Sequence, residues 1–363
     1  MELSICIIVK NDEVALEKCL KSLAPYEVEI VIVDTGSTDK TKKTAKRYTD
    51  SVYDFKWCDD FSKAKNYAVH LAKNEMVLVL DSDEWIESLD EKELCKLMQK
   101  NQGQIGRIQR VNLLEKDGIP QDNKEWIHRI FSKEHFMYEG KIHEQVISKR
   151  KQEYLTYQAP ITIMHTGYLG TKEKLEAKAK RNLTLLLLEL KEEEEDPYIL
   201  YQLGKSYYMI SEYQKACEYF AEGLEFDVNP ELEYVNDMVE TYGYSLINSK
   251  QYEEALLFEN IYDQFGDTAD FQFLMGLIYM NNEMFEKAIE EFEKATRCIH
   301  SRVIGVNAYL AWYNIGVILE CLGYKEKAIV YYEKCGSYEK SLERLAFLSE
   351  ELRILNKNPE SLL

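Results

Sequence analysis

The stretch Met76-Val77-Leu78-Val79-Leu80-Asp81-Ser82-Asp83 best indicates the fold of this chain. Its five apolar residues in a row are typical of a strand that is buried on both faces, as in a parallel sheet. Two similar runs rich in Val and Ile precede it, at residues 3–9 and 28–33, and segments of helical length separate the three runs. This alternation predicts an α/β domain with a mostly parallel sheet.

The pattern becomes less regular after Asp83, and further strands are expected at residues 105–111, 127–131 and 161–165. From residue 172 onward the chain has helical periodicity almost throughout, and an acidic run at 192–196 precedes Pro197. We therefore predict an α/β domain at residues 1–170, a helical linker at 171–196 and an all-α domain at 197–363.

The all-α part contains an internal repeat of glycine and alanine. Four Gly and Ala pairs are each 12 positions apart: Gly204 with Ala216, Gly243 with Ala255, Gly276 with Ala288, and Gly316 with Ala328. Small residues let the two helices of a hairpin approach closely, and this spacing is typical of tetratricopeptide repeats. The alternative is a helical bundle in which the spacing arose by chance. The prediction is an all-α tetratricopeptide-repeat solenoid that offers a surface to a peptide partner or a contact for a homodimer.

Charge and cysteine content limit the class of protein. The formal net charge of -19 disfavours non-specific binding to nucleic acid or to an anionic membrane. The eight cysteines are scattered without the close spacing of a zinc or redox motif, as expected of reduced thiols in the cytoplasm. We expect no signal peptide and no membrane span.

Two carboxylates follow the strand at 76–80. Asp81 and Asp83 therefore emerge at the carboxyl end of a parallel strand, where open α/β sheets bind ligands. Two hard oxygen donors one residue apart can share a divalent cation with phosphate oxygens. The same Asp-x-Asp pattern is also common in solvated turns, so the evidence for a ligand site here is its position at the end of a strand.

Asp34 ends the preceding strand in the same way. It follows residues 29–33, and Gly36 close behind it permits a tight turn. A carboxylate at this place can accept from a base N–H or from a ribose hydroxyl. The alternative is an ordinary strand-to-helix turn with an Asp cap.

Three segments together resemble the successive signatures of glycosyltransferase family 2: residues 3–11, 33–39 and 80–85. The resemblance covers about residues 1–170 and implies a GT-A (Rossmann-like) fold, a Mg²⁺ or Mn²⁺ cofactor and inversion at the anomeric carbon. It implies that Asp34 contacts the nucleoside and that Asp83, with Asp81, holds the metal. The donor-binding residues implied are Val9, Asn11, Asp34, Asp60, Lys65, Asn66, Asp81 and Ser82.

A narrower likeness appears at residues 57–66, 138–144 and 165–168. With helical repeats behind them, these segments are similar to the sublancin-type enzymes that glycosylate bacteriocin peptides on cysteine or serine. The two-domain arrangement also resembles flagellin-modifying transferases, and both likenesses imply a polypeptide acceptor. One departure is Lys65, where the family usually has Arg; lysine keeps the charge but loses the bidentate fork.

Two histidines complete the candidate site. His165 follows an apolar stretch and precedes a glycine, and by resemblance to other GT-A enzymes it completes the metal shell; alternatively it is a hydrogen-bonded core histidine. His143 precedes Glu144, our candidate general base, and either orients it or contacts the donor. The Glu-Asp base motif of many relatives is not evident. A cysteine acceptor would demand less of the base, because the ordinary pKa of a thiol, ~8.5, lies far below that of an alcohol.

The sequence thus predicts a metal-dependent, inverting transferase that moves a hexose from a UDP-sugar to a Cys or Ser/Thr side chain of a peptide or protein. One alternative acceptor is flagellin or a cell-surface glycan. An alternative of another class is a non-catalytic tetratricopeptide adaptor with a degenerate transferase domain.

Overall fold

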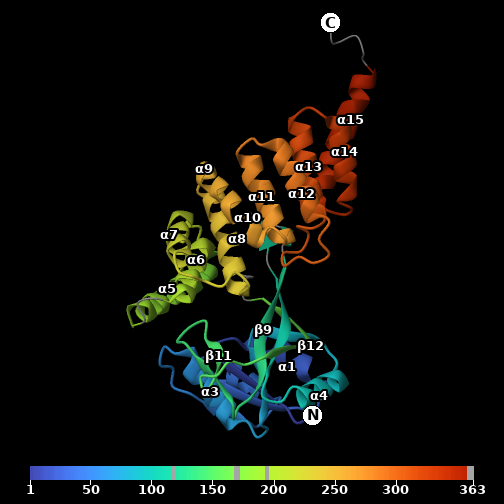
Figure 1. The fold of residues 1–363 in the computed structure, drawn as a ribbon. Coiled ribbons are helices and arrows are strands. Elements are labelled where there is room, and N and C mark those ends of the chain that lie inside the picture. Colours follow the sequence, from blue (N-terminus) through green and yellow to red (C-terminus); the bar gives the residue numbers. More distant parts are fainter. Residues whose placement is uncertain (114, 117–118, 121, 167–171, 193–195, 358–363) are drawn as a thin grey trace. The chain divides into compact units, whose positions relative to one another are not determined.

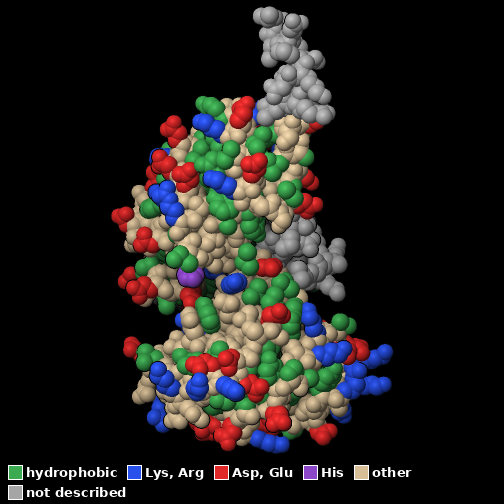
Figure 2. Space-filling view, turned by 90° about the vertical axis from the view of Figure 1, so that its right-hand side faces the viewer, with side chains coloured by type: hydrophobic (Ala, Val, Ile, Leu, Met, Phe, Trp, Pro, Cys, Tyr) green, Lys and Arg blue, Asp and Glu red, His purple; other side chains and the backbone are tan. Residues whose placement is uncertain are grey.

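The computed structural model describes residues 1–113, 115–116, 119–120, 122–166, 172–192 and 196–357. The chain divides into two compact units, Met1–Glu194 and Glu195–Leu363 (Figure 1). Within the described residues, no helix is both long and apolar enough to cross a membrane. On the face shown in Figure 2, acidic and basic side chains occur together on each unit.

The first unit is built on an eight-stranded sheet of order β3-β2-β1-β4-β9-β6-β12-β5. Its strands are β1 (Ser4–Val9), β2 (Glu29–Asp34), β3 (Val52–Asp54), β4 (Met76–Asp81), β5 (Glu84–Leu89), β6 (Ile105–Asn112), β9 (Asn123–Ser132) and β12 (Thr156–His165). Neighbours are parallel from β3 to β4 and between β6 and β12, whereas β9 and β5 run antiparallel to their neighbours. The predicted mostly parallel α/β sheet is confirmed. Two short hairpins add β7 (Glu115–Lys116) with β8 (Ile119–Pro120), and β10 (Phe136–Glu139) with β11 (Gln145–Ser148).

Helices cover both faces of this sheet, because the buried strands alternate apolar side chains between them. On one face Leu78 and Leu80 of β4 share a core with Leu16 of α1 (Glu13–Leu23) and Leu94 of α4 (Glu91–Lys100). On the other face Val77 and Val79 share a core with Ala64 of α3 (Phe61–Leu71). The remaining helices of the unit are α2 (Thr41–Ala45) and α5 (Lys172–Glu192).

Helix α5, which the sequence predicts as a linker, belongs to the first unit and contacts other parts of it directly. The Arg181 guanidinium lies 5.5 Å from the ring centre of Phe61, and Glu189 Oε1 accepts a hydrogen bond of 3.1 Å from the backbone N–H of Lys141. These contacts place α5 beside the loops that follow β3 and β10.

The second unit is all α, as predicted. Its helices are α6 (Pro197–Met209), α7 (Tyr213–Leu224), α8 (Glu233–Asn248), α9 (Tyr252–Ala255), the 3-10 helix Leu256–Ile261, α10 (Tyr262–Phe265), α11 (Ala269–Asn281), α12 (Phe285–Ala295), α13 (Tyr309–Cys321), α14 (Lys325–Lys334) and α15 (Glu339–Lys357). The pairs α6 with α7, α11 with α12, and α13 with α14 form the hairpins, while residues 252–265 form three short helical pieces instead of one helix.

The repeated glycines have a packing role in these hairpins. A Cβ on Gly276 would lie 2.6 Å from the ring of Phe292, and one on Gly204 would lie 2.4 Å from the ring of Phe220. Only glycine therefore lets the aromatic ring of the second helix reach the backbone of the first. This explains why the Gly and Ala spacing predicted the repeats.

Candidate active site

The carboxyl ends of β1, β2 and β4 lie side by side at one edge of the sheet. Val9 is in register with Asp34, and Ile8 is in register with Asp81. The loops that continue from these strands bring together most of the residues predicted for the donor and the metal.

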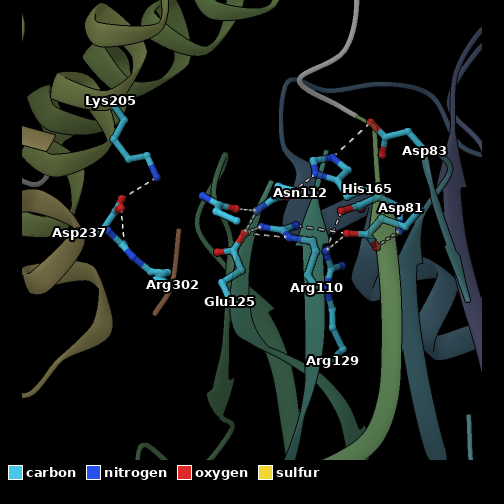
Figure 3. Close-up of polar contacts among 12 residues, drawn as sticks. Asp81, Asp83, Arg110, Asn112, Glu125, Arg129, His165, Lys205, Asp237 and Arg302 are labelled. Carbon is cyan, nitrogen blue, oxygen red and sulfur yellow. Dashed lines mark hydrogen bonds and ion pairs between the residues drawn. The ribbon is translucent and has the colours of Figure 1, made fainter. Parts of the chain in front are cut away.

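Asp81 lies between two buried cations. Its Oδ1 is 2.8 Å from Lys65 Nζ. Its Oδ2 is 2.8 Å from Arg129 Nη2 (Figure 3). Burial acts to raise the pKa of this carboxyl, but Arg129 and Lys65 outweigh it and hold the pKa well below its ordinary value. Asp81 is therefore ionised and paired on both oxygens.

Lys65 connects the acidic turn to the candidate base. Its Nζ is also 2.6 Å from Glu144 Oε1, and its side chain is only 5% exposed. Burial acts to lower the pKa of this ammonium group, but Asp81 and Glu144 together raise it above its ordinary value. The structure thus brings Lys65, Asp81 and Glu144, all predicted site residues, into direct contact.

Arg129 reaches the site because of an irregularity in its strand. The pairing of β9 with β6 shifts register at Gly106 and Arg107, which leaves Arg129 as an extra residue in β9. Its Nη2 is 3.0 Å from Oε1 of Glu84, a fully buried carboxylate whose Oε2 accepts from the Asp81 backbone N–H at 2.9 Å. Glu84 ties the turn at 81–84 to this arginine, a role that sequence reasoning missed.

A second arginine continues the network. Arg110 Nη1 is 3.2 Å from Glu84 Oε1, and its Nε and Nη2 are 3.1 and 2.9 Å from Glu125 Oε1. Asn112 contacts Glu125 in turn. Sequence reasoning missed these three residues as well. Arg110 and Glu125 face each other on neighbouring strands, but the sequence does not show which strands are neighbours.

Asp83 and His165 lie at the far end of the network (Figure 3). His165 Nε2 is 3.5 Å from Asp83 Oδ2, and His165 Nδ1 is 2.7 Å from Asn112 Oδ1. Burial acts to raise the pKa of Asp83, but the hydrogen bond and charge of His165 lower it overall. Of the predicted metal ligands, Asp83 and His165 are adjacent, whereas Asp81 is held by Lys65 and Arg129. Among the residues described, no group of three or more His, Cys, Asp or Glu has the arrangement of a metal site.

Asp34 carries one carboxylate oxygen that is bound and one that is not. Its Oδ1 accepts from the backbone N–H groups of Gly36 and Ser37, at 3.0 and 2.8 Å. Gly36 has φ +107°, a conformation that other residues rarely adopt, so the turn depends on glycine. Oδ2 is buried and has no hydrogen-bond partner in the described part of the chain. A buried acceptor of this kind calls for a donor from a ligand.

Val9 and Asn11 shape the loop that follows Asp34. The carbonyl of Val9 accepts from the Thr35 N–H at 2.9 Å, and Asn11 Oδ1 accepts from the Thr38 N–H at 2.7 Å. Their observed partners lie within this loop.

The other predicted donor residues also have partners within the fold. Ser82 Oγ donates to Asp12 Oδ2 at 2.8 Å, and Asp60 caps α3 by accepting from the Lys63 N–H at 2.9 Å. Asn66 pairs with both backbone groups of Tyr138, each at 2.8 Å. His143, beside Glu144, has a left-handed backbone with φ +52°. Their roles toward a donor stay predictions.

Comparison with protein families agrees with this architecture. Residues 4–151 match the family "Glycosyl transferase family 2", and residues 269–297 and 309–342 match "Tetratricopeptide repeat". The chain therefore carries a glycosyltransferase family 2 domain followed by C-terminal tetratricopeptide repeats.

Two curated relatives each match about three-fifths of this chain. The SPbeta prophage-derived glycosyltransferase SunS of Bacillus subtilis is 26% identical over 230 residues, which are 60% of this chain and 52% of that protein. A TPR repeat-containing protein of Synechococcus elongatus is 26% identical over 237 residues, 61% of this chain and 56% of that protein. The chain thus spans about half the length of the curated relatives it matches.

Solved structures give weaker likenesses. MamA from Desulfovibrio magneticus covers 47% of this chain and 97% of its own, with 24% identity and a TM-score of 0.37. Glucosyl-3-phosphoglycerate synthase from Mycobacterium tuberculosis, in complex with Mg²⁺ and UDP, covers 30% of this chain and 43% of its own, with 18% identity and a TM-score of 0.25. At these scores neither likeness bears on function.

Proposed function

We propose that this chain transfers a hexose from a UDP-sugar to a Cys or Ser/Thr side chain of a peptide or protein, with inversion at the anomeric carbon. The observation that carries the proposal is Asp34, whose Oδ2 is buried without a partner among the described residues while backbone N–H groups fix Oδ1. Uracil offers an N–H group, and ribose offers hydroxyls, that would satisfy this oxygen. The family match at residues 4–151 supports the same assignment.

The diphosphate end of the donor would lie toward Asp83 and His165. Their facing atoms are 3.5 Å apart and belong to a carboxylate and an imidazole, so this pair fits Mn²⁺ or Mg²⁺ as two protein ligands, with phosphate oxygens supplying others. The cation would stabilise the charge that develops on the leaving diphosphate. Asp81 would act indirectly, because its two oxygens hold Lys65 and Arg129 near the site.

Transfer with inversion needs one displacement. The acceptor oxygen or sulfur attacks the anomeric carbon, the bond from that carbon to the diphosphate oxygen breaks, and the acceptor proton passes to a base. Glu144 is our candidate base, positioned by the 2.6 Å ion pair with Lys65, and His143 precedes it in the same loop. A thiol acceptor would need little help from this carboxylate.

The polypeptide acceptor is supported by the C-terminal half of the chain. Tetratricopeptide repeats commonly bind peptide segments of partner proteins, and two segments of this chain match that repeat. The repeats could recruit the acceptor or join two subunits as a homodimer.

The test is a transfer assay with the purified chain. UDP- and GDP-sugars are incubated with Mn²⁺ or Mg²⁺ and with synthetic peptides that carry one Cys, Ser or Thr, and the products are weighed by mass spectrometry. We expect one UDP-hexose to be consumed and its sugar to appear on a peptide. If the chain neither binds UDP nor consumes a nucleotide sugar, the result would favour the alternative function, a non-catalytic tetratricopeptide adaptor.

A further inference from the structure

Asn112 lies between the candidate metal ligand His165 and the ion pair of Arg110 with Glu125. It ends β6 and is in parallel register with His165 on β12 and in antiparallel register with Asn123 on β9. Its side chain is 2% exposed, and its Oδ1 is 2.7 Å from His165 Nδ1. The contact is therefore a buried hydrogen bond between two strand ends.

The ion network decides which way the Asn112 amide points. Asn112 Nδ2 contacts Glu125 Oε1 and is 2.7 Å from Asn123 Oδ1. An ionised carboxylate can only accept, so the amide nitrogen must face Glu125. Arg110 holds that carboxylate in the ionised form with two hydrogen bonds, at 3.1 and 2.9 Å.

The amide orientation in turn sets the tautomer of His165. With its nitrogen toward Glu125, Asn112 presents its oxygen to His165, and an oxygen acceptor requires the proton on Nδ1. A neutral ring protonated on Nδ1 keeps its lone pair on Nε2. That atom faces Asp83 Oδ2 at 3.5 Å. The other tautomer would place an N–H there, and an N–H cannot bind a cation.

We propose that Asn112 is a positioning residue for the metal: it fixes His165 in the Nδ1–H tautomer, so that Nε2 can share a divalent cation with Asp83. This inference rests on the proposed function. It explains why a series of polar contacts, from Arg110 through Glu125 to Asn112, ends at this histidine. Partners of this kind commonly orient metal-binding histidines, and their loss costs about 10- to 100-fold in metal affinity.

The experiment measures Mn²⁺ binding to the full chain in the presence of UDP, from the loss of the free Mn²⁺ signal in electron paramagnetic resonance. Asn112→Leu keeps the approximate volume but removes the acceptor, and we expect about 10- to 100-fold weaker binding. Asn112→Ser is measured alongside, in case the leucine variant does not fold, and must weaken binding too. Asn123→Ala is the matched control, since it contacts the same amide from the nitrogen side and should leave the affinity within about threefold.

Two further readouts separate positioning from general damage. In the metal-free protein, at an alkaline pH where the imidazole is neutral, nitrogen NMR of the His165 ring should show the proton on Nδ1 in the wild type and a mixture of tautomers in Asn112→Leu. The double variant Asn112→Asp with Glu125→Gln exchanges amide and carboxylate but keeps an oxygen toward His165, so it should restore most of the Mn²⁺ affinity.

Unchanged Mn²⁺ affinity in folded Asn112→Leu, or an unchanged His165 tautomer, would overturn the inference. Asp83→Asn distinguishes this from failure of the proposed function. If Asp83→Asn loses Mn²⁺ and Asn112→Leu does not, only the positioning role is wrong. If Asp83→Asn binds Mn²⁺ as tightly as the wild type, the proposed metal site fails and the inference fails with it.

Discussion

Asp34→Asn tests the nucleoside site at the level of single atoms. Asparagine has the shape of aspartate, and the two backbone N–H groups that now bind Oδ1 will retain the amide oxygen there. The amide nitrogen must then take the place of Oδ2. The variant therefore presents a donor where the wild type presents a buried, unpartnered acceptor.

The expected loss follows from this exchange. A hydrogen bond to a charged group contributes about 1.5–3 kcal/mol, and about 1.4 kcal/mol is a tenfold change in affinity. UDP should therefore bind Asp34→Asn about 10- to 150-fold more weakly than the wild type. The turn keeps both of its hydrogen bonds, so the melting temperature without ligand should hardly change.

Isothermal titration calorimetry with UDP and with CDP measures the effect and identifies the contact. Uracil carries a hydrogen at N3, whereas cytosine has a lone pair there. A contact with the base therefore predicts that the variant gains affinity for CDP and loses affinity for UDP. A ribose contact predicts equal losses for both nucleotides. Asp39→Asn, on the same loop but exposed, is the control and should bind as the wild type does. UDP affinity within twofold of the wild type in Asp34→Asn would refute the role of this carboxylate.

Three other outcomes are expected. Lys65→Met leaves two carboxylates without their shared buried cation and should lower the free energy of unfolding by about 3–5 kcal/mol in urea titrations. Lys63→Met is the control and should change little, because its ammonium group is exposed and its partner Asp60 keeps the hydrogen bonds from Ser62 and from the Lys63 N–H. Burial lowers the pKa of His128 from 6.5 to about 4, so the neutral ring stabilises the fold fully above pH 6.5 and this stability is lost as the pH falls toward 4. Between pH 6.5 and 4, the melting temperature of His128→Gln should therefore fall less steeply than that of the wild type. Gly276→Ala should destabilise the repeats by about 1–3 kcal/mol, because its Cβ would meet the Phe292 ring. Adding Phe292→Leu should recover part of that loss, as measured by calorimetry. If the effects of the two substitutions simply add, the packing argument is contradicted.

Local patterns in the sequence were enough for the strands and the repeats. Residues 3–9, 31–33 and 77–80 are buried, and the apolar runs that contain them can be recognised without knowledge of their partners. The strand Glu84–Leu89 was not predicted, since its residues neither form an apolar run nor alternate regularly, and its partner at the sheet edge, β12, lies far along the chain. The broken helix at 252–265 was also missed, because the pairing of Gly243 with Ala255 predicts the same hairpin as in the other repeats; here a Cβ on Gly243 would meet Leu274 at 2.6 Å as well as the Phe258 ring at 3.1 Å.

The candidate site was predicted only in part, because charges select partners in space rather than along the chain. The sequence points to Asp81 as a metal ligand but cannot show that Lys65 and Arg129 converge on it. Nor can it show that Glu84 is fully buried. Buried carboxylates need such cations, since an unpaired charge in the interior costs several kcal/mol.

Lys65 shows what the structure adds. By sequence, a lysine in place of the arginine usual in the family keeps the charge but loses the bidentate fork. In the fold its Nζ lies between two carboxylates, at 2.8 Å from Asp81 and 2.6 Å from Glu144, a place that suits a compact charge. Arg129 already gives Asp81 a guanidinium, and a second one at position 65 would bring two planar cations against one carboxylate. The substitution is therefore compatible with an intact site, and because Asp81 is paired on both oxygens, we propose Asp83 and His165 as the pair that faces the donor.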